Sequence, residues 1–355
     1  MDGEGVASGE EDGDYQPEVR GGQVEGLIRA RAEENGPWFI SFTPLAPHTE
    51  QPEGAANTGL RPPLDSADTD ATATTGGSID EASKAGGPNA DAHTEPVPAF
   101  RWAFPRPAPR HRGALAAQAQ RVPSFGVVGE GKPAAIRDRP ELDEATIRLI
   151  DQSYQLELAT LLAVDEWVAR LLDALDETGQ LDDTVVIFTS DNGYFHGQFN
   201  VAFQKYHLYQ PAVQVPLVIR GPGFGSGRVE DVVANVDLAP TIYALAGVEP
   251  PVEVDGVDLA ALAAGRPSAP GRAVLLENQS QGGAVHAEAV HDGRYVLIEH
   301  STGERELYDV RDDPHQLQNL SGEVEIATLE ANLSAWLAVL RTCAGDSCRA
   351  PRPQS

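Results

Sequence analysis

The sequence predicts an α/β protein whose main body alternates helices with short apolar strands and is followed by a small antiparallel sheet with one helix. Segments with helical periodicity are separated by short apolar runs rich in β-branched and aromatic residues. Polar residues follow the end of each apolar run, as expected where strands end at one edge of a sheet. Beyond Gly265 the pattern changes to short, half-alternating runs with turns such as Asp292-Gly293. Alternating helices and buried strands are typical of the α/β class.

The first segments of the chain predict a lead-in, a helix and a strand. Residues 1–16 are polar and acidic and are expected to form a flexible lead-in. Residues 17–34 carry apolar residues at helical spacing, and Asn35-Gly36-Pro37 predicts the end of that helix. The run WFISFT at 38–43 is short, apolar and rich in β-formers, which predicts a buried strand.

Residues 50–120 are predicted to be an inserted loop, disordered over much of its length. From 50 to 97 there is almost no large apolar residue, so this stretch cannot bury much surface. Residues 98–123 are basic and rich in proline. They predict either a solvated loop draped over an acidic body or an anion-binding surface.

The clearest helix is predicted over residues 143–178, where apolar side chains recur at steps of three and four. Gly179 is expected to end it as the residue just beyond the cap. Residues 184–189 (TVVIFT) and 215–220 (VPLVIR) are continuous apolar runs, predicted to be buried strands of a mainly parallel sheet. A further helix is predicted over 236–246.

The sequence divides into a main domain, residues 17–265, and a small C-terminal subdomain, residues 266–348, with a tail over 349–355. The subdomain is predicted to be an antiparallel sheet with one helix packed on it. Its strands are expected at 273–277, 284–291 and 294–300, and its helix at 323–341.

Composition excludes several classes of protein. Acidic residues outnumber basic ones 54 to 26, for a net charge of −28, which argues against a nucleic-acid binder. No run approaches the roughly 18 apolar residues of a transmembrane segment. Two cysteines are too few for a disulfide scaffold. The first residues have neither the basic start nor the apolar stretch of a secretory signal, so either the protein is cytoplasmic or the chain begins at a different point from its relatives.

Candidate functional residues follow the predicted strands. Asp191-Asn192 comes directly after the 184–189 run and offers a carboxylate and a carboxamide, hard oxygen donors that suit Ca²⁺ or Mg²⁺. Asp-Asn-Gly is also a common turn sequence. Lys205 can neutralise an anionic substrate group if it reaches the sheet edge, or it can be a solvated surface lysine.

Five ordered segments resemble the sulfatases. They are PWFISFTPLAPH (37–48), TVVIFTSDNGYFHGQF (184–199), KYHLYQPAVQVPLVIRGPGF (205–224), VVANVDLAPTIYALAGV (232–248) and ELYDVRDDPHQLQNL (306–320). The Gly-Gln-Phe after Asp-Asn-Gly and the Lys-x-x-x-Tyr that follows are most similar to N-acetylglucosamine-6-sulfatase-like enzymes. The resemblance covers about residues 14–48 and 121–348, and five motifs in order make chance similarity a poor explanation.

The resemblance implies an alkaline-phosphatase-like α/β fold. It also implies an enzyme that hydrolyses sulfate esters, either sulfated carbohydrates or aryl sulfates, at a divalent cation, usually Ca²⁺. It implies that Asp191 and Asn192 are metal ligands, that His48 contacts the sulfate or the leaving group, and that Lys205 contacts the sulfate. In this family the nucleophile is a formylglycine made from the Cys or Ser of a C/S-x-P-x-R motif. Cys343 and Cys348 resemble a short C-terminal disulfide of exported sulfatases, and in a reducing compartment they would be plain thiols.

The chain departs from the family pattern in its first part. The family's first pair of metal-binding aspartates and its nucleophile motif have no match before the first resembling segment. Ser268-Ala-Pro-Gly-Arg272 fits the nucleophile pattern literally but lies far down the chain, and it is interpreted as chance.

Two hypotheses therefore stand. The protein is a sulfatase-family hydrolase, or it is a catalytically inactive truncated fragment or pseudoenzyme that keeps half of the metal and sulfate site and binds Ca²⁺ weakly. In the second case an apolar edge or face of the main sheet is expected to be exposed. The chain would then associate or dissolve poorly unless a complementing N-terminal chain covers that surface.

Overall fold

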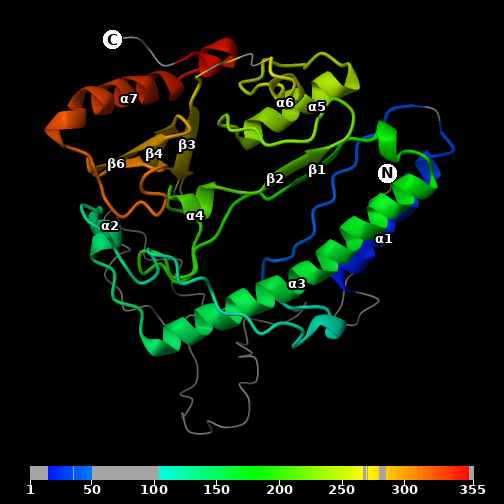
Figure 1. Cartoon of the computed structure of the whole chain (residues 1–355), viewed down its shortest axis with the longest axis horizontal. Helices are drawn as coiled ribbons and strands as arrows, with labels where there is room; N and C mark the ends of the chain where they lie inside the picture. Colours follow the sequence, from blue (N-terminus) through cyan, green and yellow to red (C-terminus); the bar gives the residue numbers. More distant parts are fainter. Residues whose placement is uncertain are drawn as a thin grey trace, which may run out of the picture.

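The computed structural model describes residues 15–34, 36–49, 104–266, 269, 271–279 and 285–351. The fold is mixed α/β: a long helix, α3, runs along one side, and a four-stranded antiparallel sheet with one helix, α7, lies at one end (Figure 1). The predicted lead-in over 1–14 and most of the predicted insertion, 50–103, lie outside the described residues. Within the described ranges, no helix has both the length and the apolar character needed to cross a membrane.

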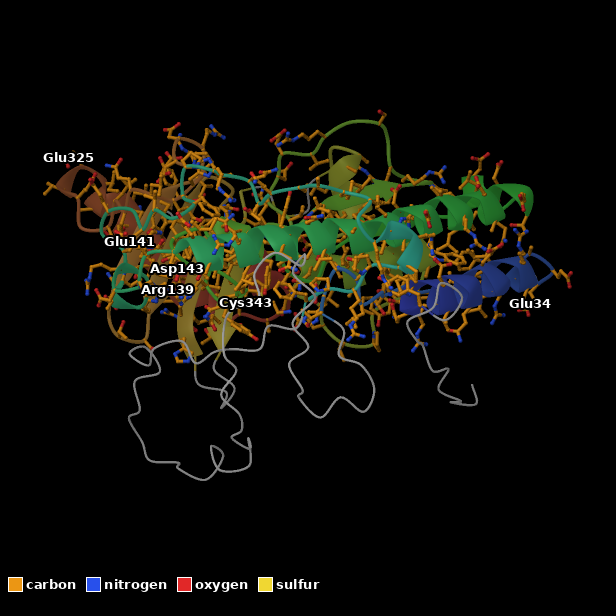
Figure 2. The ribbon with its side chains drawn as sticks, turned by 90° about the horizontal axis from the view of Figure 1, so that it is seen from below. Glu34, Arg139, Glu141, Asp143, Glu325 and Cys343 are labelled. Atoms are coloured by element: carbon orange, nitrogen blue, oxygen red, sulfur yellow. A yellow bond between two sulfur atoms is a disulfide. The ribbon has the colours of Figure 1, made fainter. Side chains whose placement is uncertain are left out.

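Two helices from distant parts of the sequence pack against each other. α1 (Gln16–Arg31) lies beside α3 (Glu144–Glu177), as the turned view in Figure 2 also shows. Close approach depends on Gly21, because a Cβ there would lie 2.1 Å from Cδ2 of Trp167. The helix predictions over 17–34 and 143–178 are confirmed.

Both ends of α3 follow from the sequence. Asp143 caps the first turn, its carboxylate accepting from the amide of Thr146 at 2.7 Å. At the other end Gly179 has φ +71°, and the amide of Gln180 donates to the carbonyl of Leu175 at 2.8 Å. This pair of features is a Schellman termination, which needs a residue that adopts the left-handed conformation without strain.

The prediction of a buried strand at 38–43 is wrong. Residues 37–45 are extended but belong to no strand of the described structure, and Phe39 is 68% exposed. Trp38 and Ile40 pack against Ile28 and Leu175, and the Trp38 indole donates to the Gln180 side chain at 3.1 Å. Alternate side chains therefore face the helix pair, which explains the β-like composition without a β ladder.

The prediction of buried, mainly parallel strands in the main body is also wrong. β1 (Val186–Thr189) and β2 (Leu217–Arg220) form a two-stranded antiparallel sheet in which Phe188 lies opposite Val218. These two side chains are 44% and 62% exposed. A continuous apolar run is buried on both sides only where other elements pack on both faces of its sheet. No element of the described structure covers the face of the β1–β2 sheet that carries Phe188 and Val218.

The small sheet agrees with its prediction and adds one strand. β3 (Val274–Gln279), β4 (Val285–His291), β5 (Tyr295–His300) and β6 (Arg305–Asp309) pair antiparallel in that order. β6 was not expected. α7 (Ala327–Leu340) covers one face and buries Trp336 and Leu337 against Val290 and Leu297.

The opposite face of the small sheet is covered by the loop that follows β1. Phe195, Phe199 and Tyr209 of this loop pack against the sheet residues Ile298 and Tyr308. The remaining helices are α2 (Ala134–Arg137), α4 (Gln210–Val213), α5 (Leu238–Ala246) and α6 (Leu259–Ala263). The prediction of a helix over 236–246 is thus confirmed, and the loop after β1 joins the two sheets (Figure 1).

The described part of the predicted basic segment, residues 104–123, lies along acidic helices. Arg110 pairs with Glu18 of α1 and Glu166 of α3, and Arg121 pairs with Asp151 of α3 at 2.7 Å. The described residues 104–120 therefore have a defined path along α3. These contacts favour a loop draped over an acidic body, because carboxylates already compensate both guanidinium groups.

Candidate functional site

The candidate site is built on residues 190–212, here called the site loop. Asp191 follows β1 directly and is exposed, while Asn192 is half-buried. The Asp191 carboxylate accepts from the amide of Asn192 at 2.9 Å, and the Ser190 hydroxyl donates to the carbonyl of Asn192, also at 2.9 Å. These short-range bonds hold the carboxylate and the carboxamide together at the end of the strand.

Gly193 closes the two ends of the site loop onto each other. Its amide donates to the carbonyl of Ala212 at 2.8 Å, and a Cβ at this position would lie 2.1 Å from the carbonyl oxygen of Pro211. The glycine of Asp-Asn-Gly is therefore required by a close backbone approach rather than by a free turn. It fixes Asn192 beside α4.

Lys205 lies on the same loop. The amide of Phe195 donates to the carbonyl of Gln204 at 2.9 Å, which brings residue 205 back toward the segment after Asn192. The Lys205 side chain is half-buried, and no salt bridge in the described part of the chain engages its ammonium group. A half-buried cation without a counter-charge is suited to an anionic ligand.

His48 is held on a separate segment. It follows the cis peptide bond Ala46–Pro47, and its amide donates to the carbonyl of Leu45 at 2.8 Å. Its ring is exposed, with Nδ1 lying 3.1 Å from the carbonyl oxygen of Thr49. Among the described residues no hydrogen bond connects His48 to the site loop. The structure thus places Asp191, Asn192 and Lys205 on one loop and leaves His48 outside it.

The described residues do not by themselves make a metal centre. Across the described ranges, no group of three or more His, Cys, Asp or Glu side chains gathers in a way that could hold an ion. Asp191 and Asn192 offer hard oxygen donors, but Ca²⁺ takes roughly six to eight oxygen ligands. The donor set found here does not fit a complete site, so no chemical step is derived through a metal.

A glutamate–histidine pair that links the site loop to α3 was not predicted from the sequence. His196 Nε2 lies 2.7 Å from Glu157 Oε2, and the rings of Tyr154 and Tyr194 meet the imidazole edge-on. Burial, with a smaller contribution from the Glu157 charge, raises the pKa of Tyr194 to about 12. The sequence offers no signal for this pair, because Glu157 is one acidic residue among many on α3.

The two cysteines and the arginine of the serine pattern, which the search for a nucleophile motif singles out, are engaged in other contacts. Cys343 and Cys348 form a disulfide, so neither is a free thiol. Arg272, the last residue of the literal Ser268–Arg272 pattern, is buried in a two-pronged ion pair with the fully buried Asp237. Ser268 itself lies outside the described residues. The arginine of that pattern is therefore occupied by a structural contact.

Comparison with known families identifies two matching models. The family "Sulfatase" matches residues 23–248, and "N-sulphoglucosamine sulphohydrolase, C-terminal" matches residues 197–342. Among curated proteins, the N-acetylglucosamine-6-sulfatase of Bos taurus is 29% identical over 295 residues, covering 72% of this chain and 52% of the bovine protein. The N-acetylglucosamine-6-O-sulfatase of Bacteroides thetaiotaomicron is 33% identical over 186 residues, covering 50% of this chain and 33% of that protein.

Solved structures show the same fold. The phosphonate monoester hydrolase of Agrobacterium radiobacter superposes with a TM-score of 0.59 at 21% identity, covering 95% of this chain and 62% of that one. At this identity the similarity concerns the fold alone. The chain spans about half the length of the bovine relative and a third of the bacterial one.

Proposed function

The chain belongs to the sulfatase family, and from this membership we propose that it acts in the hydrolysis of sulfate esters of sugars. The family model runs through β1, the site loop and α5, the part of the chain that carries the candidate residues. The observation that carries the proposal is the arrangement on the site loop: an exposed carboxylate and a carboxamide at the strand end, with a half-buried lysine on the same loop that forms no salt bridge with the described residues.

The proposed substrate class is a sulfated hexosamine. Two of the relatives are described as acting on the 6-sulfate of N-acetylglucosamine, so this ester is the first substrate to test. A sulfate monoester carries one negative charge that persists throughout hydrolysis. The binding residues must therefore supply a cation, and Lys205 is the candidate.

The chain's own residues have distinct proposed roles. The Lys205 ammonium would balance the charge of the sulfate oxygens, and His48 would contact the sulfate or give a proton to the departing sugar oxygen. Asp191 and Asn192 would contribute two oxygen ligands to a divalent cation, whose remaining ligands the described residues do not supply. Hydrolysis then breaks the S–O bond of the ester and forms a new one to the oxygen of water, which gives the sugar hydroxyl and hydrogen sulfate; the latter ionises to sulfate.

We further propose that the 355-residue chain by itself does not turn over sulfate esters. Both cysteines are bridged, and the arginine of the serine pattern is bound to Asp237, so a formylglycine nucleophile has no evident precursor among these residues. Loss of a nucleophile removes turnover rather than slowing it slightly. A complementing polypeptide that carries the nucleophile would restore it.

The proposal is tested by separating sulfate binding from turnover. Inorganic sulfate is titrated into the purified chain labelled at lysine with ¹³C, and the Lys205 signal is followed by NMR. We expect a saturable shift of the signal that Lys205→Ala removes from the spectrum, and Arg228→Ala, an exposed control, should leave that shift in place. No response of Lys205 at any sulfate concentration would contradict the proposed sulfate site. Turnover of an aryl sulfate by the chain alone, lost in Lys205→Ala, would contradict the proposed inactivity.

A further inference from the structure

A lysine is fully buried where the site loop meets the small sheet. The side chain of Lys132 has no exposed surface, and its ammonium lies over three aromatic rings. The distances from Nζ to the ring centres are 4.2 Å for Phe199, 3.9 Å for Tyr209 and 4.4 Å for Tyr308. An ammonium within about 6 Å of a ring face is attracted by the ring quadrupole, and the attraction grows when water is excluded.

The buried charge is matched by a buried carboxylate. Glu306 of β6 is fully buried, with Oε2 lying 3.5 Å from Lys132 Nζ. The carboxylate accepts from the Tyr209 hydroxyl at 2.9 Å and from the Tyr308 hydroxyl, and His300 Nε2 lies 2.7 Å from it. Lys132 in turn donates to the Tyr308 hydroxyl at 2.8 Å. Each charged group thus has polar partners, as burial requires.

The cluster joins three parts of the chain that are distant in sequence. Phe199 and Tyr209 belong to the site loop, and Glu306 and Tyr308 belong to β6. Lys132 comes from a third segment, whose Glu130 amide donates to the carbonyl of Leu317 at 2.7 Å. The Asn319 side chain also donates to the carbonyl of Gly131 at 2.7 Å. The lysine is therefore fixed to the sheet side and reaches into the site loop.

The choice of lysine at this position is unusual for this chain. Of its 26 basic residues only three are lysines: Lys84, Lys132 and Lys205. Lysine carries a compact point charge on a flexible apolar stem, whereas arginine presents a planar fork of five donors. A space bounded by three rings and one carboxylate fits the ammonium and leaves most donors of a guanidinium without partners.

We propose that Lys132 is a positioning residue of the candidate site: by filling the aromatic cage it fixes the site loop, and with it Asp191 and Lys205, on the small sheet. The functional part of this statement rests on the proposed sulfatase activity, whereas the placement of the loop does not. The inner face of the loop carries the cage walls, while Asp191 on the same loop is exposed. A shift of the inner face therefore moves the candidate residues.

The cage has a distinctive dependence on pH. Burial, opposed in part by the charge of Glu306, lowers the pKa of Lys132 to about 8. Opening of the loop hydrates the lysine, returns its pKa toward the ordinary value near 10.5 and so takes up a proton. Between pH 8 and pH 10 opening therefore becomes less favourable as pH rises, by up to about tenfold per pH unit.

Other groups near the cage titrate outside this window or with the opposite sign. Burial raises the pKa of Tyr209 and of Tyr308, so their contribution to stability is lost only above about pH 10. Burial raises the pKa of Glu306, but the hydrogen bond from His300 and the charge of Lys132 outweigh it and hold this pKa below its ordinary value. The remaining charged neighbours of the network are Asp313, Glu304 and Arg139.

The test combines lysine NMR with hydrogen exchange on the full chain. With three lysines, Lys132→Met identifies one ¹³C signal, which should lie upfield from ring currents and titrate near pH 8. Exchange of site-loop amides, corrected for the intrinsic rate, is compared at pH 7.5, 8.5 and 9.5 in the wild type and in Lys132→Met, Lys132→Arg, Glu306→Gln and the Lys132→Met/Glu306→Gln double variant.

We expect Lys132→Met to open the site loop about three- to tenfold more often at pH 9.5, because the neutral lysine of the wild type still fills the cage and donates to the Tyr308 hydroxyl, whereas methionine cannot donate. At pH 7.5 the difference should be smaller, because burial of the ammonium group itself favours opening in the wild type. The double variant should recover part of this loss, Lys132→Arg should not restore the wild-type value, and the pH slope should vanish in Lys132→Met. If a variant fails to fold, the pH dependence of loop opening in the wild type still tests the proposal.

Three results would overturn the proposal. One is a wild-type opening constant that does not fall between pH 7.5 and 9.5. Another is an increase in exchange in Lys132→Met that is as large in α1 as in the site loop. The third is unchanged sulfate binding at Lys205 in a variant whose loop is open. Absence of sulfate binding in the wild type would instead contradict the proposed function and leave the first two readouts in force.

Discussion

Replacement of Arg272 by methionine is expected to lower the free energy of unfolding by about 3–5 kcal/mol. The magnitude follows from the environment of its partner. Asp237 is fully buried and accepts from the amides of Ala234 and Val257, both at 2.8 Å, and from the Arg272 guanidinium, with Nη1 at 2.9 Å from Oδ1. Methionine keeps much of the apolar stem but removes the only side-chain cation paired with this carboxylate within the described structure.

The measurement is urea denaturation of the wild type, Arg272→Met, Asp237→Asn and the double variant. The two single substitutions should be less than additive, because each already breaks the same ion pair. Arg228→Met is the matched control: Arg228 pairs with Glu230 at 2.8 Å, but both side chains are largely exposed, so little change is expected.

A loss below about 1 kcal/mol for Arg272→Met, with strict additivity, would refute the structural role of the ion pair. The same experiment bears on the Ser268–Arg272 pattern. A large loss of stability would assign Arg272 to the fold, so that its place in the pattern needs no catalytic explanation.

Three further predictions concern the site loop, the exposed face and the C-terminus. Gly193→Ala should cost about 1–3 kcal/mol in urea denaturation, because its Cβ would meet the Pro211 carbonyl; an unchanged midpoint would contradict the close approach. The Phe188→Ser/Val218→Ser double variant should sediment with less self-association than the wild type, whereas Val324→Ser, an isolated exposed residue, should not; equal behaviour would contradict an adhesive β1–β2 face. Reduction of the C-terminal disulfide should raise hydrogen exchange around Gly345, whose amide donates to Asp255 at 2.7 Å, and leave α3 unchanged; uniform exchange would contradict this local role.

Local signals predicted the helices and the small sheet well. The ends of α3 could be read because each depends on residues within one turn, an aspartate cap and a C-terminal glycine. The alternating pattern of the small sheet was equally local, and only β6 was missed, which overlaps the start of the family-like segment 306–320.

The strands of the main body could not be assigned from the sequence. An apolar run such as 184–189 predicts a strand, but its partner and its coverage depend on distant segments. β1 pairs antiparallel with β2 and leaves one face uncovered by described residues. The run 38–43 packs against the surface of two helices instead of pairing with another strand. Its composition is the same in either case, so composition alone could not distinguish them.

The candidate site was predicted unevenly for the same reason. Asp191, Asn192 and Lys205 were found because they lie close in sequence and in a recognisable order. The Glu157–His196 pair and the Lys132–Glu306 pair were missed, since their members are separated by 39 and 174 residues and neither pair has a sequence signature. The roles of Asp191, Asn192 and Lys205 as ligands or catalysts remain predictions, which the lysine and sulfate titrations test.

The site loop has two faces with opposite demands, and this explains why its position depends on the small sheet. Its inner face carries Phe195, Phe199 and Tyr209, which are buried, whereas its outer residues Asp191 and Lys205 must stay accessible to bind an anion or a cation. Hydrogen bonds among exposed polar groups fix the geometry of a loop only weakly, because solvent competes for each of them. The geometry must be set from the buried side, where aromatic packing and the caged lysine lie. Substitutions on the sheet side of this interface should therefore alter ligand binding at residues they never touch.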